Sequence, residues 1–304
     1  MVRVLVTGGA GFIGHNLALY LANRGYDVVV YDSLERASNL GVIKVKEKGI
    51  PVIVGDVRDE GKLKASLRDV DVVVHAAAYV DVEESFRKPL MYFNNNVLGT
   101  VSTVKCSVES NVGFVVYLSS AAVYGEPKYL PIDEKHPVEP ISPYGLSKLM
   151  GEYVLNFYSR VYGLKYAILR VFNVYGPGQT SSYAGVVSKF IKRVKKGLPP
   201  IIYGDGFQTR DFIYVDDVSE AIRLVIEKRS CDVFNVASGR EVSVNELAGI
   251  VLKISGLKIK PIYEAARPGD IRRSVADISK IVKVLGFKPK ISLESGLKKL
   301  LNTV

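Results

Sequence analysis

The sequence predicts an α/β fold: a doubly wound parallel sheet together with a second, smaller domain. Short apolar runs recur from the first residues to segment 232–237, and helical patterns lie between them. Alternation of this kind is typical of a parallel sheet covered by helices on both faces. A glycine-rich turn follows the first run, and 304 residues, 48% of them hydrophobic, suffice for one large and one small domain.

The opening segment MVRVLVTGGAGFIGHN predicts a phosphate-binding turn between a strand and a helix. Residues 3–7 have the pattern of a buried strand, and the apolar residues of 12–21 have helical spacing. Glycine costs about 1 kcal/mol at an interior helix position, so Gly8, Gly11 and Gly14 need another reason. The first amides of a helix attract an anion. Gly8 would allow the tight turn, Gly11 the approach of a pyrophosphate, and Gly14 the packing of the helix on the sheet.

An acidic residue ends the second predicted strand, residues 28–31. Asp32 stands ~20 residues beyond the glycine turn, the distance at which a carboxylate binds the hydroxyls of an adenosine ribose. Its negative charge would repel the additional phosphate of NADP. Together with the turn, Asp32 predicts a Rossmann-type dinucleotide-binding domain whose cofactor is NAD.

Further apolar runs extend the predicted sheet, and they occur at 51–55, 71–75, 114–118, 166–171 and 232–237. The carboxyl ends of parallel strands share one edge, where open sheets bind ligands. After residue 173 the composition changes, and Pro- and Gly-rich loops become frequent. We therefore expect residues 1–173 plus 212–239 to form the dinucleotide-binding domain. Residues 174–211 plus 240–304 are expected to form the smaller, substrate-binding domain.

Composition excludes several classes of protein. No run of about 18 apolar residues occurs, and the chain begins directly with the first strand, so we expect neither a membrane span nor a signal peptide. Cys106 and Cys231 are the only cysteines, and they lack metal-ligand spacing. This usage suits a cytoplasmic protein with two buried thiols and no metal site.

The net charge of +10 does not by itself indicate nucleic acid as a partner. The sequence carries no zinc finger, basic zipper or RNA-recognition signature. The densest basic run, KFIKRVKKG, predicts an amphipathic helix with a solvated lysine face. Its apolar face would comprise Phe190, Ile191, Val194 and Leu198. We therefore expect no nucleic-acid partner.

The segment SPYGLSKLMGEYVLNFYSRVYG predicts a long helix that begins at Pro143 and carries candidate catalytic residues. Tyr144 and Lys148 are four residues apart and share a face. A phenol has a pKa near 10, but a nearby ammonium and an oxidised nicotinamide both favour the phenolate. Such a tyrosine could take a proton from a hydroxyl while hydride leaves the same carbon. Ser120, at the end of the fifth strand, could hydrogen-bond the same oxygen.

Each of these residues also has a plain structural interpretation. A Tyr-x-x-x-Lys pattern by itself fits a surface pair, and Ser120 fits a turn that ends a strand. Three matches in the right order favour chemistry: the glycine turn, then LSSAAVYG, then YGLSK.

At this point the chain resembles a known family over essentially its whole length. It is similar to the extended short-chain dehydrogenase/reductases, and within that group to the UDP-glucose (UDP-galactose) 4-epimerases. The matching motifs, in order, are TGGAGFIG, YD, GDVRD, HAAA, NNVLGT, SSAAVYG, YGLSK, RVFNVYGPG, GDGFQTRDFIYVDD and ARPGD. The resemblance implies NAD as cofactor, a UDP-sugar as substrate and a homodimer formed through two long helices, near 90–110 and 144–161.

The resemblance also implies roles for individual residues. The amides of Phe12 and Ile13 would reach the pyrophosphate, and Asp32 would hold the adenosine ribose. The remaining cofactor contacts would come from Asp56, Val57, Ala76, Ala77 and Asn95. The catalytic residues would be Ser120, Tyr144 and Lys148. The nucleotide diphosphate and its ribose would be held by Asn173, Tyr203, Arg210, Arg267 and Asp270.

One position bears on the size of the sugar. The resemblance places Ser274 at the wall of the sugar pocket, where a tyrosine goes with plain hexoses and a small residue also with N-acetylated ones. Serine is small, so some activity on UDP-N-acetylglucosamine is expected beside UDP-galactose.

Two departures from the family pattern affect expected cofactor contacts. Val80 stands where some galactose epimerases carry a lysine, and DSLERASNL differs from the usual DNLS run after the ribose carboxylate. Neither departure bears on the reaction class.

The expected reaction is NAD-dependent epimerisation at C4 of a UDP-hexose, UDP-galactose to UDP-glucose, through a transient 4-keto sugar. Relatives that act as 4,6-dehydratases carry Asp-Glu where this chain has Ala121 and Ala122, and decarboxylases usually carry a glutamate there. A non-catalytic NAD-binding regulator would tend to lack the Ser, Tyr and Lys. Epimerisation of UDP-N-acetylglucosamine or UDP-glucuronate remains an alternative.

Overall fold

The computed structural model describes residues 1–179, 185–266 and 271–302. Its centre is a seven-stranded sheet in the order β10-β6-β5-β4-β1-β2-β3, and each neighbouring pair of strands is parallel. The strands are β1 (Arg3–Thr7), β2 (Asp27–Asp32), β3 (Val52–Val54), β4 (Val72–His75), β5 (Phe114–Ser120), β6 (Tyr166–Val171) and β10 (Val233–Val236). The predicted parallel sheet of a Rossmann-type fold is therefore confirmed.

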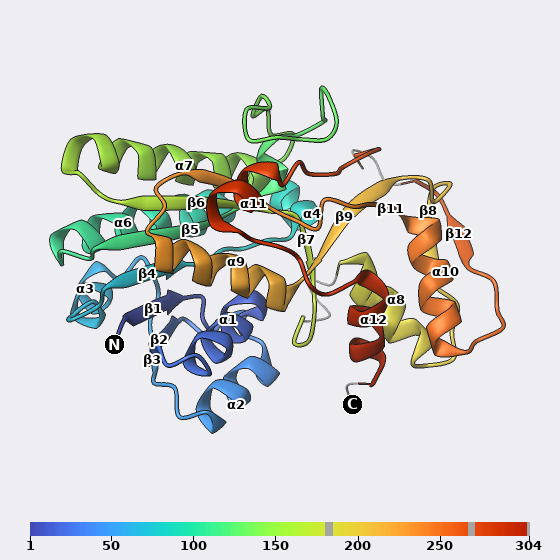
Figure 1. Cartoon of the computed structure of the whole chain (residues 1–304), viewed down its shortest axis with the longest axis horizontal. Helices are drawn as coiled ribbons and strands as arrows, with labels where there is room; N and C mark the ends of the chain where they lie inside the picture. Colours follow the sequence, from blue (N-terminus) through green and yellow to red (C-terminus); the bar gives the residue numbers. More distant parts are fainter. Residues whose placement is uncertain (180–184, 267–270, 303–304) are drawn as a thin grey trace.

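Helices cover both faces of this sheet (Figure 1). One face carries α1 (Phe12–Ala22), α2 (Asn39–Glu47), α9 (Val215–Lys228) and α11 (Ser279–Leu285). The other carries α3 (Glu60–Ser66), α6 (Gly99–Glu109) and α7 (Pro143–Tyr162). Two short helices, α4 (Val82–Arg87) and α5 (Pro89–Tyr92), follow β4.

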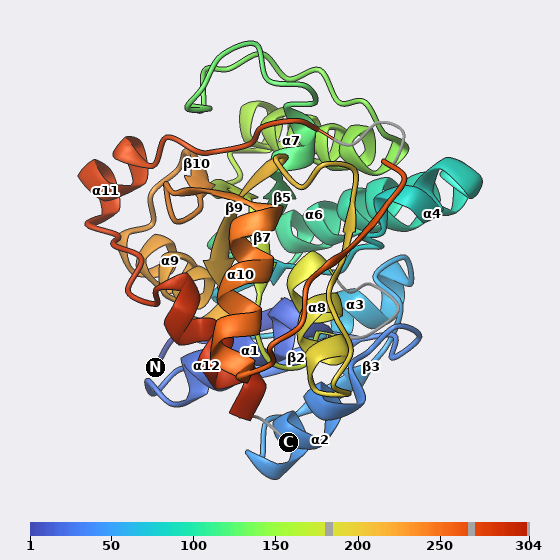
Figure 2. The same cartoon turned by 90° about the vertical axis from the view of Figure 1, so that its right-hand side faces the viewer.

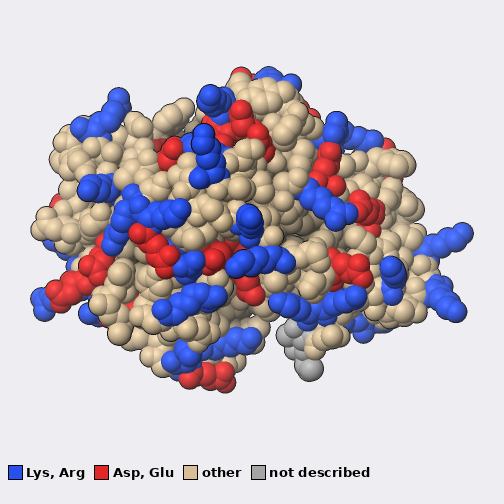
Figure 3. All heavy atoms as spheres, viewed as in Figure 1, with Lys and Arg blue, Asp and Glu red and all other residues tan. Residues whose placement is uncertain are grey.

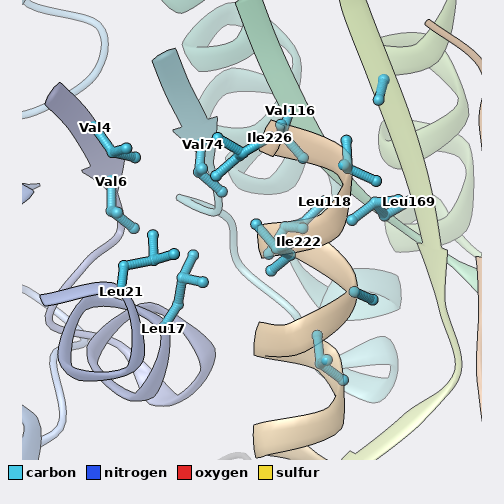
Figure 4. Packing of buried hydrophobic residues seen from close by; sticks show 14 of the residues in the cluster. Val4, Val6, Leu17, Leu21, Val74, Val116, Leu118, Leu169, Ile222 and Ile226 are labelled. Carbon is cyan, nitrogen blue, oxygen red and sulfur yellow. The ribbon is translucent and has the colours of Figure 1, made fainter. Parts of the chain in front are cut away.

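Alternation along the strands explains the two layers, because successive side chains of a strand point to opposite faces. Val4 and Val6 belong to the core beneath α1 and α9, whereas Leu5 belongs to the core beneath α3, α6 and α7. Figure 4 shows Leu17 and Leu21 of α1 directed at the first of these cores. The strand segments of the sequence are continuously apolar because both faces of the sheet are buried.

A second group of elements lies at one end of the molecule, at the right of Figure 1 and facing the viewer in Figure 2. It contains the three-stranded sheet of β11 (Glu241–Ser243), β9 (Thr209–Tyr214) and β7 (Asn173–Tyr175). It also contains the pair β12 (Ile262–Glu264) and β8 (Ile201–Tyr203), with helices α8 (Val186–Val194), α10 (Val244–Ser255) and α12 (Leu293–Asn302). The predicted boundaries between two domains stay a prediction.

Three local expectations need correction. Helix α8 ends at Val194, so Leu198 lies beyond it and is exposed, while Phe190, Ile191 and Val194 are buried as predicted. The thiol of Cys231 is exposed, whereas that of Cys106 is buried.

The third correction concerns the expected helix near 90–110. It is interrupted by a π-helical segment, η1 (Phe93–Leu98), between α5 and α6. The side chain of Asn96 in this segment accepts a hydrogen bond from the Tyr79 amide at 2.8 Å and donates to the Ser147 hydroxyl at 2.9 Å. These contacts hold the π-helical segment η1 against α7, beside the candidate site.

Candidate active site

One cavity of about 300 Å³ lies along the carboxyl edge of the seven-stranded sheet. Its lining comes from the segments at the ends of β1 to β6, from Asn95 of η1 and from the first turns of α7, among others. It contains every residue that the sequence predicted for the cofactor or for catalysis: Gly8, Gly11, Phe12, Ile13, Gly14, Asp32, Asp56, Val57, Ala76, Ala77, Asn95, Ser120, Tyr144 and Lys148. Folding thus gathers residues from half of the chain at one edge.

Close contacts within the chain require glycine at two positions of the glycine turn. Gly8 has a φ of +66°, and a Cβ placed on it would lie 2.7 Å from the Cα of Ala77. A Cβ on Gly14 would lie 2.1 Å from the carbonyl oxygen of Gly8. Gly14 therefore lets the start of α1 pack against the turn itself, and not only against the sheet. No described side chain caps α1, so the amides of its first turn remain for an anion.

Asp32 is 8% exposed and is held by the backbone. Its carboxylate accepts hydrogen bonds from the amides of Ala10 at 2.9 Å and Leu34 at 2.8 Å. Burial raises its pKa, and the bonds from backbone amides lower it. A carboxylate has about four acceptor sites, so Asp32, which lines the cavity, keeps acceptor capacity for a ribose hydroxyl. The described residues therefore fit a dinucleotide whose adenosine ribose lies at Asp32.

Helix α7 places the two candidate catalytic side chains. The Ser142 hydroxyl caps its start by accepting a hydrogen bond from the Gly145 amide at 3.0 Å, and Pro143 occupies the first turn. Tyr144 and Lys148 are both buried, and both line the cavity. Ser120 lines the same cavity at the end of β5, and its hydroxyl accepts a hydrogen bond from the Ala122 amide at 3.1 Å.

Burial sets the charges of this group. It raises the pKa of the Tyr144 phenol, and a hydrogen bond with Ser120 opposes that rise. Burial lowers the pKa of Lys148 to about 7, and the charge of Glu152 opposes that fall. The ammonium lies 4.5 Å from the centre of the Tyr117 ring. Burial therefore favours the neutral phenol, and formation of the phenolate needs positive charge beside Tyr144.

A buried ion pair lies behind these residues, and the sequence analysis missed it. Arg170 of β6 donates to both oxygens of Glu152, at 3.0 and 2.7 Å, and the Ser119 hydroxyl donates to the same carboxylate at 2.5 Å. Glu152 stands one helical turn beyond Lys148, a spacing that could have signalled it. The pair fixes α7 against β5 and β6 and so fixes Tyr144 relative to Ser120.

The residues after Ser120 carry no acid or base. Ala121 and Ala122 begin a single 3₁₀ turn, Ala121–Val123, whose third residue is buried apolar Val123. Beside this turn, the groups in the cavity lining that could move a proton are Ser120, Tyr144 and Lys148.

Four of the predicted substrate residues lie outside the described lining of the cavity. Asn173 donates to the carbonyl of Asp211 at 3.2 Å, and Arg210 donates to the carbonyl of Ile271 at 2.6 Å. Tyr203 ends β8, and Ser274 is buried. Arg267 and Asp270 lie outside the described residues, so the structure does not place them.

Other classes of site find little support. Among the residues that the structure describes, no three His, Cys, Asp or Glu side chains are grouped as a metal would require. No helix in the described ranges has the length and apolar character needed to cross a membrane. On the face shown in Figure 3, basic side chains are interspersed with acidic ones.

Comparisons with known proteins agree with this geometry. Residues 4–237 match the family described as the NAD dependent epimerase/dehydratase family. The chain is 42% identical to a Methanocaldococcus jannaschii protein provisionally named a UDP-glucose 4-epimerase, over 98% of this chain and 97% of the relative.

Two solved structures are similar over nearly their whole length. A UDP-glucose 4-epimerase from Thermotoga maritima, solved with UDP-glucose, is 38% identical with a TM-score of 0.94, and 99% of this chain and 97% of that one are covered. A UDP-N-acetylglucosamine 4-epimerase from Methanobrevibacter ruminantium, solved with UDP-N-acetylmuramic acid, is 36% identical with a TM-score of 0.93 at the same coverage. The chain therefore belongs to the NAD-dependent epimerase/dehydratase family of extended short-chain dehydrogenases, and its cofactor is NAD.

Proposed function

We propose that this protein epimerises a UDP-hexose at C4, with UDP-galactose and UDP-glucose as its pair of substrates. The observation that carries the proposal is that Ser120, Tyr144 and Lys148 line the same cavity as Asp32. The two alanines after Ser120 support epimerisation over dehydration, because elimination of water from the sugar needs a further acid and base.

The chain's own residues would act on the C4 hydroxyl. Bound NAD supplies a reversible acceptor for the C4 hydride. Tyr144 takes the hydroxyl proton as the carbon is oxidised and returns it after the keto sugar has turned over. Ser120 holds the same oxygen by a hydrogen bond. Lys148, buried one turn along α7, adds positive charge that favours the phenolate.

Product identification tests this function. The purified protein is incubated with UDP-galactose, UDP-glucose, UDP-N-acetylglucosamine and UDP-glucuronate without added cofactor, and the products are identified by NMR. We expect interconversion of the first two. A 4-keto-6-deoxy product would point to a dehydratase instead, and complete absence of turnover would favour a binding protein.

The size of the sugar is a separate prediction. We expect turnover of UDP-N-acetylglucosamine as well, with selective loss of that activity in Ser274→Tyr, since the acetyl group enlarges the volume that the sugar sweeps as it turns. Ser274 is 8% exposed, so Ser274→Ala serves as a control that removes the hydroxyl without filling space. Steady-state kinetics on both sugars decide the matter. Equal losses on both sugars in Ser274→Tyr would refute the proposed role.

We also propose that the protein is a cytoplasmic homodimer. An exposed apolar row follows one side of α7 at spacings of three and four residues and comprises Leu146, Met150, Tyr153, Phe157 and Val161. Leu90, 81% exposed, lies in α5, which packs against α7. Monomeric proteins rarely expose such a continuous apolar surface. Both cysteines are free, as suits a reducing compartment.

Light scattering after gel filtration tests the dimer. We expect twice the chain mass of 33.4 kDa for the protein and the monomer mass for Phe157→Glu, because a buried carboxylate without a partner opposes association. Lys165→Glu, a substitution beyond the end of α7, is the control. A wild-type protein of monomer mass would contradict the proposal.

A further inference from the structure

A cluster of side chains joins two loops at the edge of the cofactor cavity. One loop, 33–38, follows β2, and the other, 76–81, follows β4; these two strands flank β1 in the sheet. Arg36 of the first loop donates to the two carboxylate oxygens of Glu84 at 2.7 and 3.3 Å. The same guanidinium lies 3.7 Å from the centre of the Tyr79 ring in the second loop. The cluster therefore crosses the sheet edge where β1 ends.

Neighbouring residues hold both ends of the cluster. The Tyr79 hydroxyl donates to the carboxylate of Glu35 at 2.9 Å. Two contacts therefore join the loops, Arg36–Tyr79 and Tyr79–Glu35. The Tyr92 hydroxyl donates to Glu84 at 3.0 Å and fixes that carboxylate from α5. We call the set Glu35, Arg36, Tyr79 and Glu84 the clasp.

The Arg36–Glu84 ion pair of the clasp is largely shielded from solvent, whereas Glu35 is exposed. The side chains of Arg36 and Glu84 are 21% and 16% exposed, so salt screens their attraction less than that of a surface pair. Hydrogen bonds from Arg36, and to a lesser extent from the Tyr92 hydroxyl and Lys88, lower the pKa of Glu84 to about 2. Glu84 is therefore a carboxylate at any physiological pH, and bidentate charged bonds of this kind are among the stronger ones in proteins.

The clasp belongs to the same cavity as the ribose carboxylate. Arg36 and Tyr79 line the cavity together with Asp32 and Ser33, which begins the first loop. We propose that the clasp is a further part of the cofactor site, which closes over the adenosine half of NAD and sets the rate at which the cofactor leaves. Two of its members, Glu35 and Arg36, lie in the DSLERASNL segment, where this chain departs from its family's pattern.

Slow release suits the chemistry of the site. An epimerase returns its cofactor to the starting oxidation state in each cycle, so it gains nothing from exchanging it. For the adenosine half to leave, the loops after β2 and β4 would have to separate, and the Arg36–Glu84 bonds and the Arg36–Tyr79 contact would break. This inference rests on NAD as the cofactor and not on the identity of the sugar.

The release rate of NADH tests the clasp. The full-length protein is loaded with NADH, mixed with excess NAD in a stopped-flow instrument, and followed by NADH fluorescence. We expect Arg36→Met to release NADH about 10-fold faster, the factor that corresponds to about 1.4 kcal/mol. Glu84→Gln should act in the same direction, and the double variant should be no faster than Arg36→Met alone, because both substitutions break the Arg36–Glu84 bonds.

A matched control comes from α4, the helix that carries Glu84. Glu83 of α4 forms an exposed pair with Arg87 at 2.8 Å, so Glu83→Gln removes a charge beside the clasp and should leave the release rate unchanged. Thermal unfolding of each variant checks that the fold is kept. Tight binding with equal release rates in Arg36→Met and the wild type would overturn the clasp alone. Additive effects in the double variant would do the same, whereas a wild-type protein that binds no NADH would overturn both the clasp and the cofactor.

Discussion

Replacement of Tyr144 by phenylalanine should lower turnover by about two to four orders of magnitude, the range that general acid–base catalysis contributes. The ring of Tyr144 is buried and packs edge-on against Tyr92, with 6.5 Å between ring centres, and phenylalanine keeps both of these features. The fold and the bound NAD should therefore persist. Turnover numbers are measured together with the NAD released on denaturation.

Two further variants serve as comparisons for Tyr144→Phe. Ser120→Ala should reduce activity less than Tyr144→Phe, because it removes one hydrogen bond and leaves the base in place. Tyr158→Phe removes a phenol from the same helix α7 at a distance from the cavity and should leave turnover unchanged. If Tyr144→Phe retained near-normal activity, the proton would have to move through another group, and the assignment would fail.

The parts of the molecule that sequence reasoning predicted well are those with local signals. Strand β1, the glycine turn and helix α1 are adjacent in the chain, so apolar spacing and three glycines define them together. Tyr144 and Lys148 share a face because four residues make about one helical turn. Asp32 could be found from its distance to the turn. Each of these inferences needs only one or two neighbouring elements.

The parts that sequence reasoning missed depend on contacts between distant residues. Arg36 meets Glu84 across 48 positions of sequence, and nothing in either segment alone specifies that bond. Arg170 meets Glu152 only after β6 has paired with β5 and α7 has packed on both. The π-helical turn likewise depends on contacts of Asn96 with Tyr79 and Ser147, which lie in other elements.

The charge of Lys148 is the clearest example of a property that pairwise spacing cannot give. The sequence suggests an ammonium that favours a phenolate at Tyr144. The fold buries this lysine almost completely, at 3% exposure, and so lowers its pKa to about 7. The net effect depends on how many buried atoms surround the group, which is a property of the whole core.

Lys148→Met should therefore have two opposite effects. Loss of the ammonium removes a charge that favours the Tyr144 phenolate and a donor at the cavity wall, so turnover should fall by at least about 100-fold. Methionine is similar in length and apolar, so the buried site accepts it without the cost of desolvating a charge. The variant should consequently be less active and, at neutral or acidic pH, more stable than the wild type.

The pH dependence of stability separates this explanation from simple repacking. Unfolded lysine has a pKa near 10.4, so between pH 7 and that value the unfolded chain binds a proton that buried Lys148 does not. Stability rises with pH where the unfolded state binds more protons, so Lys148 should make the wild type gain stability from about pH 7 upward. In Lys148→Met that gain disappears, and the stability advantage of the variant should be largest at about pH 6 and shrink as pH increases toward about 10.

Urea unfolding of both proteins after removal of NAD measures the difference, with Lys46→Met, on the exposed side of α2, as the control. A difference between Lys148→Met and the wild type that stays constant with pH would show that Lys148 is not buried as a weak base.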